Sequence, residues 1–142
     1  MSMFDGIDKV SSTGGGSRLT PGKHRFLINA LKAPPGLRTG RCFIAEMTVV
    51  STTSSNYVEG QSVSWVRNRD GKFPELALGE IKNFVAAAAN CDENTVGPAE
   101  CDAAVAENQP FAGRMVDCDA FDKPFKSDSS KVFTKAIWSP VE

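Results

Sequence analysis

Histidine is almost absent from this chain, and none of its cysteines lie close together in the sequence. The 142 residues include one histidine, His24, and four cysteines without a C-x-x-C pair. Structural zinc needs ligands two to four residues apart, whereas Cys91 and Cys101 are ten apart. We therefore expect no metal, no cofactor and four free thiols, with Cys42 and Cys118 as small buried strand residues. Catalysis by a Ser/His/Asp or Cys/His set would rest on His24, which has no local motif and is better explained as a structural histidine.

Long apolar runs are also missing. No run approaches the roughly 18 residues that a membrane span needs, and the N-terminus is polar from Ser2 onward. We therefore expect no signal peptide, no transmembrane helix, no membrane partner and a cytoplasmic location. The length and the 41% hydrophobic content suit one domain. Residues 1–20, with the Gly/Ser-rich run 11–17, predict a flexible arm ahead of a folded domain over 21–142.

The charges that are present are sorted along the chain. Residues 1–72 contain ten Lys and Arg against five Asp and Glu, whereas residues 73–110 contain one Lys against seven acids. Residues 111–142 have five of each sign, and the whole chain has a net charge of −1. If the fold separates the first two segments, it presents one cationic and one anionic face. A polyanion could bind to the cationic face.

Alternation of apolar residues predicts five strands. The first three are expected at 23–32, 41–51 and 60–68, and the last two at 110–120 and 131–138. The segment 121–130 is charged and rich in turn-forming residues, so it is predicted to be the loop between the last two strands.

The period changes to that of a helix over 75–90. Ala77, Ile81, Phe84, Val85 and Ala88 form one apolar stripe at helical spacing. A second short helix is predicted to begin at Pro98 and to run through 106, because proline suits a first helical turn. Together they form an acidic helical insert at about 75–107.

The resulting order, β-β-β-α-β-β, is that of the OB-fold, a five-stranded, partly open Greek-key barrel. Ligands of this fold lie over strands 2 and 3, between the loop joining strands 1 and 2 and the loop joining strands 4 and 5. Cationic and aromatic residues alternate in these segments. The candidate binding residues are Arg38, Arg41, Phe43, Trp65, Arg67, Arg69, Lys123, Phe125 and Lys126. Lys and Arg neutralise phosphates while aromatic rings stack on unpaired bases, so the mixture favours sequence-tolerant binding of single-stranded DNA.

Four segments resemble the small OB-fold single-stranded-DNA-binding proteins of tailed bacteriophages. They are P-G-K-H-R-F-L-I at 21–28, G-Q-S-V-S-W-V at 60–66, I-K-N-F-V-A-A-A at 81–88 and F-T-K-A-I-W at 133–138. The resemblance spans 21–138. It implies protection of replication or recombination intermediates, no catalysis, replication or recombination proteins as partners, and the cytoplasm of a phage-infected host. Many such proteins end in an acidic tail that recruits partners, whereas this chain ends in Ser-Pro-Val-Glu with a single acid.

The roles of the aromatic residues remain open at this level. Trp65 shares a strand face with Val63, as a core residue would, but also with Arg67 and Arg69, and charged groups are rarely buried unpaired. Phe43 shares its face with Arg41 and with three apolar residues. Each ring is therefore either a core residue or a platform for bases.

Two other function classes compete with DNA binding. One is a protein-interaction or virion-structural β-barrel whose acidic helices bind a partner. The other is a metal-dependent nuclease using Asp117 and Asp119, with Asp122 nearby, although such acidic runs are usually solvated surface. For the DNA-binding hypothesis, we expect the protein to act as a homo-oligomer or along a coated strand.

Overall fold

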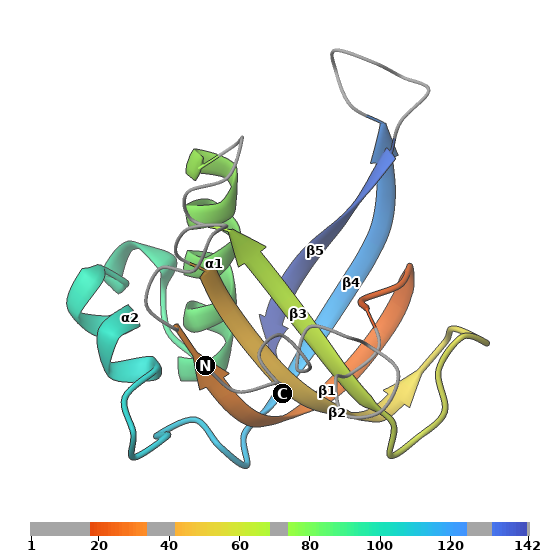
Figure 1. The fold of residues 1–142 in the computed structure, drawn as a ribbon, viewed down its shortest axis with the longest axis horizontal. Coiled ribbons are helices and arrows are strands. Elements are labelled where there is room, and N and C mark those ends of the chain that lie inside the picture. The colour runs from red at the N-terminus through yellow and green to blue at the C-terminus, as the bar shows by residue number, and fades with distance from the viewer. Residues whose placement is uncertain (1–17, 34–41, 69–73, 125–131, 142) are drawn as a thin grey trace, which may run out of the picture.

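The computed structural model describes residues 18–33, 42–68, 74–124 and 132–141. The described chain is mainly β, with a five-stranded antiparallel sheet and two α-helices (Figure 1). The elements follow the predicted order: β1 (Gly22–Lys32), β2 (Cys42–Thr52), β3 (Ser62–Asn68), α1 (Pro74–Ala89), the 3₁₀ turn η2 (Glu93–Thr95), α2 (Pro98–Ala104), β4 (Met115–Pro124) and β5 (Val132–Pro140). No helix within these ranges is long and apolar enough to cross a membrane.

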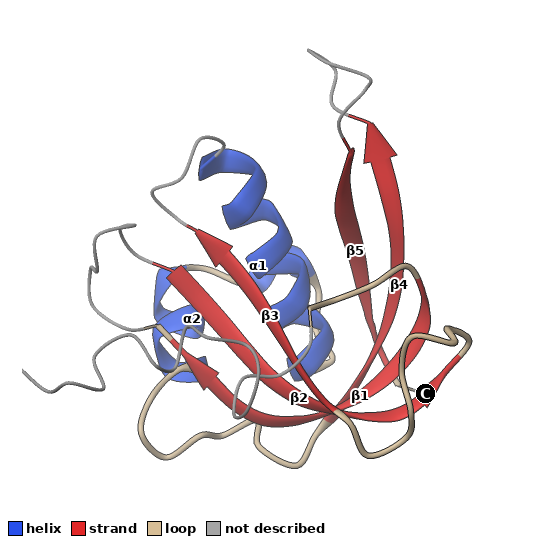
Figure 2. Ribbon diagram, turned by 45° about the vertical axis from the view of Figure 1, so that its right-hand side comes forward, coloured by secondary structure: helices blue, strands red, loops and turns tan. Residues whose placement is uncertain are grey.

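The strand order in the sheet is β3-β2-β1-β4-β5, with every neighbouring pair antiparallel. Over the described residues no ladder joins β3 to β5, so the sheet is not closed. The expectation of five strands is therefore confirmed, and that of a barrel is not. In Figure 2 the sheet curves strongly, and the far end of the β4–β5 hairpin projects away from the other strands.

β1 lies at the centre of the sheet and is bent by two irregularities. Its pairing with β2 shifts register between Arg25 and Phe26 and again between Ile28 and Ala30. Such bulges increase the local twist of a strand and let it curve. The second shift also explains why Leu31 is buried with Phe26 and Ile28, although strict alternation would place it on the opposite face.

α1 lies against the inner face of the sheet, with most of its contacts to the strands on β5. All five residues of the predicted apolar stripe are buried, as expected. Phe84 lies at the centre of the aromatic core, with ring centroids 5.5 Å from Trp65 and 4.7 Å from Trp138. Large aromatic side chains bury much apolar area, so this cluster joins α1, β3 and β5 on the side where no strand pairing exists.

Side chains occupy two strand edges that lack a neighbouring strand. On β5, the Asn83 amide accepts from Trp138 N (2.8 Å) and donates to Trp138 O (3.1 Å). On β1, past the end of its pairing with β4, the Gln109 amide makes the same two bonds to Leu31 (2.7 and 2.8 Å). Unpaired backbone groups at an edge are costly to bury and prone to pair with another chain, and these amides satisfy them.

β4 differs from its prediction at both ends. It begins at Met115, because residues 110–113 form turns in which Gly113 has φ of 88°. It continues to Pro124 because residues 120–124 pair with β5, from Ala120 opposite Ala136 to Pro124 opposite Val132. The prediction of a loop beginning at Phe121 is therefore wrong for residues 121–124. A run of charged residues in a hairpin ladder has no local signature that separates it from a loop.

Candidate nucleic-acid interface

The two aromatic residues proposed as platforms on strands 2 and 3 lie in the core. Trp65 is 1% exposed and Phe43 is 5% exposed. Phe43 is edge-on to both Trp65 (6.1 Å) and Phe84 (5.6 Å). Neither ring has a free face for a base in this structure, so the core alternative describes both.

Arg67 points to the same side as Trp65, but it is paired. Its guanidinium lies 4.8 Å from the centroid of the Trp65 ring, and Nη2 donates to Glu80 Oε2 of α1 (3.1 Å) and to Thr134 O of β5 (3.1 Å). The side chains of Arg67 and Glu80 are only 23% and 9% exposed. The charge of Arg67 therefore does not mark a solvent-facing side of β3. Glu80 of α1 compensates this charge, so the arginine can occupy a semi-buried position.

The described outer face of β2 and β3 has no free cation. Arg67 is the sole Lys or Arg within these two strands, and the other candidates of this region, Arg38, Arg41 and Arg69, lie outside the described residues. On the neighbouring strand β1, Lys32 forms a 3.0 Å ion pair with Glu46 of β2. Of the cations expected on this surface, Arg67 is therefore paired, and the roles of Arg38, Arg41 and Arg69 stay predictions.

The outer face of the β4–β5 hairpin does combine cations with an exposed ring. Phe121 is 37% exposed, lies directly opposite Lys135, and shares its side of β4 with Lys123, two residues further on. Ile137 lies on the same side of β5 and is 48% exposed. We call Phe121, Lys123, Lys135 and Ile137 the hairpin face. Within the described residues, no ion pair engages either lysine.

Of the hairpin face, only Lys123 was among the sequence-predicted binding residues, and it is exposed near the end of β4. Phe121 and Lys135 were missed because residue 121 was assigned to a loop. The signal that could have found them is the alternation Met115, Asp117, Asp119, Phe121, Lys123, which continues the β4 pattern through residue 123. Phe125 and Lys126, from the same predicted loop, lie outside the described residues.

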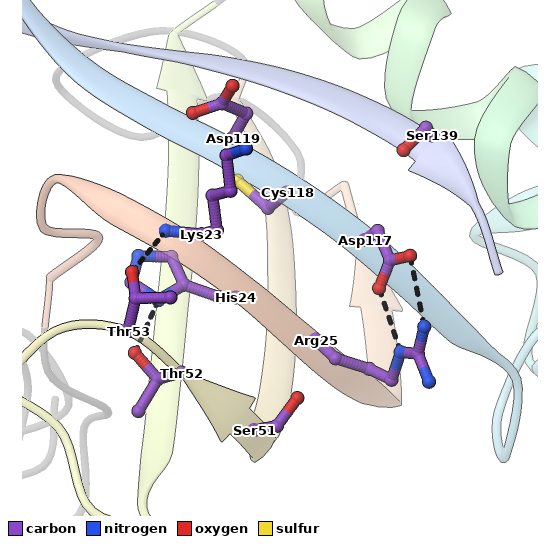
Figure 3. Close-up of a pocket in the computed structure, with 10 residues that line it drawn as sticks. All are labelled: Lys23, His24, Arg25, Ser51, Thr52, Thr53, Asp117, Cys118, Asp119 and Ser139. Carbon is purple, nitrogen blue, oxygen red and sulfur yellow. Dashed lines mark hydrogen bonds and ion pairs between the residues drawn. The ribbon is translucent and has the colours of Figure 1, made fainter.

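A surface pocket of about 500 Å³ lies beside the base of the hairpin. Its lining is polar and comes from β1, β4, β5 and the end of β2: Lys23, His24, Arg25, Ser51, Thr52, Thr53, Asp117, Cys118, Asp119 and Ser139 (Figure 3). Arg25 forms a two-pronged pair with Asp117, with Nε–Oδ1 at 2.9 Å and Nη2–Oδ2 at 3.2 Å. This pair and the juxtaposition of Lys23 with Asp119 across the β1–β4 ladder balance the charges here. The pocket is thus a polar, nearly neutral neighbour of the hairpin face.

The three acids considered for metal binding are not arranged as one site. Asp117 is held by Arg25, whereas Asp122 has the opposite parity on β4 and accepts a 2.9 Å hydrogen bond from Thr134 of β5. In the described ranges, no group of three His, Cys, Asp or Glu side chains is placed to hold a metal ion.

His24 is a structural residue, as predicted. It is buried, Nδ1 is 2.8 Å from Thr52 Oγ1, and Nε2 is 2.8 Å from Thr20 O. Its ring centroid is 5.0 Å from that of Tyr57, whose hydroxyl accepts from Thr20 N and donates to Arg18 O. Burial raises the pKa of Tyr57 above its ordinary value. This cluster fixes residues 18–20 against the start of β1.

All four cysteines are free thiols, as expected. Cys118 is buried, and burial raises the pKa of its thiol far above the ordinary value, with a smaller contribution from Asp119. Cys42 is half-buried rather than fully buried, and Cys91 is exposed.

No protein-family model matches the chain, and no curated protein matches its sequence.

Proposed function

We propose that this protein binds single-stranded DNA without catalysing a reaction, and that the hairpin face is the described part of its binding surface. The observation that carries the proposal is the exposed ring of Phe121, flanked by Lys135 across the ladder and Lys123 along the strand. A ring between two cations suits an unpaired strand, because a base stacks on the ring while its neighbouring phosphates meet the lysines. Each such stack contributes roughly 1 to 3 kcal/mol.

The proposal includes an OB-fold whose barrel is open between β3 and β5. The five strands, the order β3-β2-β1-β4-β5 and the helix between β3 and β4 support it. In that fold the loop joining strands 4 and 5 flanks the ligand, and the hairpin face leads toward that loop. The expected role is protection of replication or recombination intermediates in the cytoplasm of a phage-infected host, together with replication or recombination proteins.

Binding to the hairpin face should be sequence-tolerant and sensitive to salt. Stacking accepts any base because every base has a π-face, and each phosphate neutralised on a single strand adds about 0.7 to the slope of log K against log salt. The near-neutral pocket and the paired residues Arg25, Lys32 and Arg67 should contribute little to that slope, because their charges are already balanced by acids.

The test is a titration of fluorescein-labelled dT₃₀ by anisotropy at about 50 and about 200 mM salt, with a duplex of equal length as competitor. We expect single-strand binding that weakens with salt. Phe121→Ala should weaken it about 5- to 150-fold, corresponding to the loss of one stack. Lys135→Gln should weaken it and lower the salt slope by about 0.7.

Matched controls exist on α1, which lies against the inner face of the sheet and not on the hairpin face. Leu78→Ala removes another exposed apolar side chain. Lys82→Gln removes another lysine that forms no ion pair with the described residues. Both should bind dT₃₀ like the parent protein. No binding at low salt, or equal losses in the hairpin and control variants, would refute the proposal.

A second candidate is a protein-interaction module without nucleic-acid binding. It is favoured by Leu76 and Leu78, which are exposed at the start of α1, the helix that opens the acidic segment. Absence of dT₃₀ binding at low salt would favour this candidate.

A further inference from the structure

The outer edge of β3 is exposed, and some of its backbone groups point away from the sheet. Gln61 O, just before β3, accepts from Val49 N of β2 (2.9 Å). Because backbone groups alternate in direction along a strand, Ser62, Ser64 and Val66 direct their N–H and C=O groups away from β2. Val66 O accepts from the Nη1 of Arg67 (3.0 Å). For the outward groups of Ser62 and Ser64 there is no hydrogen-bond partner in the described part of the chain.

The rest of the molecule shows how its edges are otherwise protected. Asn83 satisfies both backbone groups of Trp138 on the edge of β5, and Gln109 satisfies both backbone groups of Leu31 on β1. Proteins also protect edges with lysine, proline or a bulge. From Ser62 to Val66, β3 has no charged residue and no proline, and its pairing with β2 is regular. An edge of this kind is a template for another strand.

We propose that the outer edge of β3 pairs with the same edge of a second copy of this chain. An antiparallel pair centred on Ser64 places the two Ser64 residues opposite each other and each Ser62 opposite Val66 of the other copy. The two Ser64 residues then exchange two N–H···O bonds, as in any hydrogen-bonded antiparallel pair.

The chemistry of this edge suits a second copy better than a charged partner. The paired segment is neutral, so no like charges meet across the two-fold axis. Val66 is 43% exposed, and part of its side chain would be buried against Ser62 of the other copy. The net charge of −1 for the whole chain opposes association little. The pairing does not depend on DNA binding, but a dimer would present two hairpin faces to one strand.

The test is the molar mass of the full-length protein in solution, by light scattering over a concentration series and without DNA. We expect a dimer of twice 15.2 kDa. Ser64→Glu should raise the dissociation constant at least about tenfold, because two new acids would face each other between the Glu46 residues that lie opposite position 64 on β2. Asn108→Asp, which adds one negative charge in the exposed turn after α2, is the matched control and should remain dimeric.

Two further measurements keep the result independent of a folding defect. Equimolar Ser64→Glu and Ser64→Lys chains should form a heterodimer, since opposite charges then meet across the axis. In the parent protein, the amide of Ser64 should become more protected from hydrogen exchange as concentration rises. A monomer at all concentrations, or a Ser64→Glu chain that dimerises like the parent, would overturn the proposal. DNA binding by a monomer would leave the proposed function intact and remove only the dimer.

Discussion

Replacement of Arg67 by alanine tests the assignment of this residue as a structural rather than a DNA-binding group. The side chain connects three elements: it starts on β3, pairs with Glu80 of α1 and donates to Thr134 O of β5. It therefore spans the side on which β3 and β5 lack strand pairing. Its loss removes the partner of a carboxylate whose side chain is only 9% exposed.

The magnitude follows from burial. Breaking a fully buried ion pair by removing one partner costs about 3 to 5 kcal/mol, mainly because a charge is left uncompensated. The Arg67 side chain is 23% exposed, so water can reach part of the site and reduce that cost. Loss of the bond to Thr134 O and of the contact with the Trp65 ring adds to it. We expect Arg67→Ala to lower the free energy of unfolding by about 3 kcal/mol.

Urea unfolding followed by tryptophan fluorescence and circular dichroism measures this change. Adding Glu80→Gln to Arg67→Ala should restore about 1 kcal/mol, because a neutral amide replaces the unpaired carboxylate. Lys82→Gln serves as the control that removes a charge from the same helix, and it should change stability by less than about 0.5 kcal/mol. A loss below 0.5 kcal/mol for Arg67→Ala would refute the structural role.

Arg67→Ala also distinguishes a structural role for Arg67 from the DNA-binding role that the sequence predicted. If Arg67 bound a phosphate, Arg67→Ala would lower the salt slope of dT₃₀ binding by about 0.7. Because the guanidinium is already engaged by Glu80, we expect the slope of the folded variant to match that of the parent protein.

Two more predictions concern the edge of β5 and the thiols. Asn83→Ala should lower the free energy of unfolding in urea by about 2 kcal/mol, because both backbone groups of Trp138 lose their partner. The control Asn94→Ala, at an exposed position, should leave stability unchanged. Equal losses in the two variants would contradict the role of Asn83 at the edge of β5. In native protein at pH 8, iodoacetamide should modify exposed Cys91 well before Cys118, since burial raises the Cys118 pKa and disfavours the reactive thiolate. Peptide mass spectrometry measures both sites, and similar rates would contradict the burial of Cys118.

The helix and strand periods were strong enough to be read from the sequence. The stripe from Ala77 to Ala88 follows helical spacing and is buried throughout. The first three strands were placed within two residues of their ends, because alternation and turn residues bracket them. The end of β4 was not predicted because residues 121–124 are strand only through their pairing with β5. The local sequence does not show that these residues have a pairing partner.

The candidate site depended much more on long-range contacts. The alternation along β3 correctly placed Trp65 and Arg67 on one side of the strand, but it does not say which side faces solvent. Arg67 lies on the inner side because it pairs with Glu80, which is thirteen residues along the chain and on α1. The hairpin face likewise required the register that sets Phe121 opposite Lys135.

The sequence by itself determined the order of elements, the apolar face of α1 and the structural role of His24, since each depends on local period, spacing or residue type. Only the tertiary structure decided that the sheet stays open between β3 and β5, that the cations of β1 to β3 are largely paired with acids, and that exposed aromatic and basic groups meet on the β4–β5 hairpin. Those features depend on which distant residues become neighbours, and the burial of a charge is affordable only where such a neighbour compensates it.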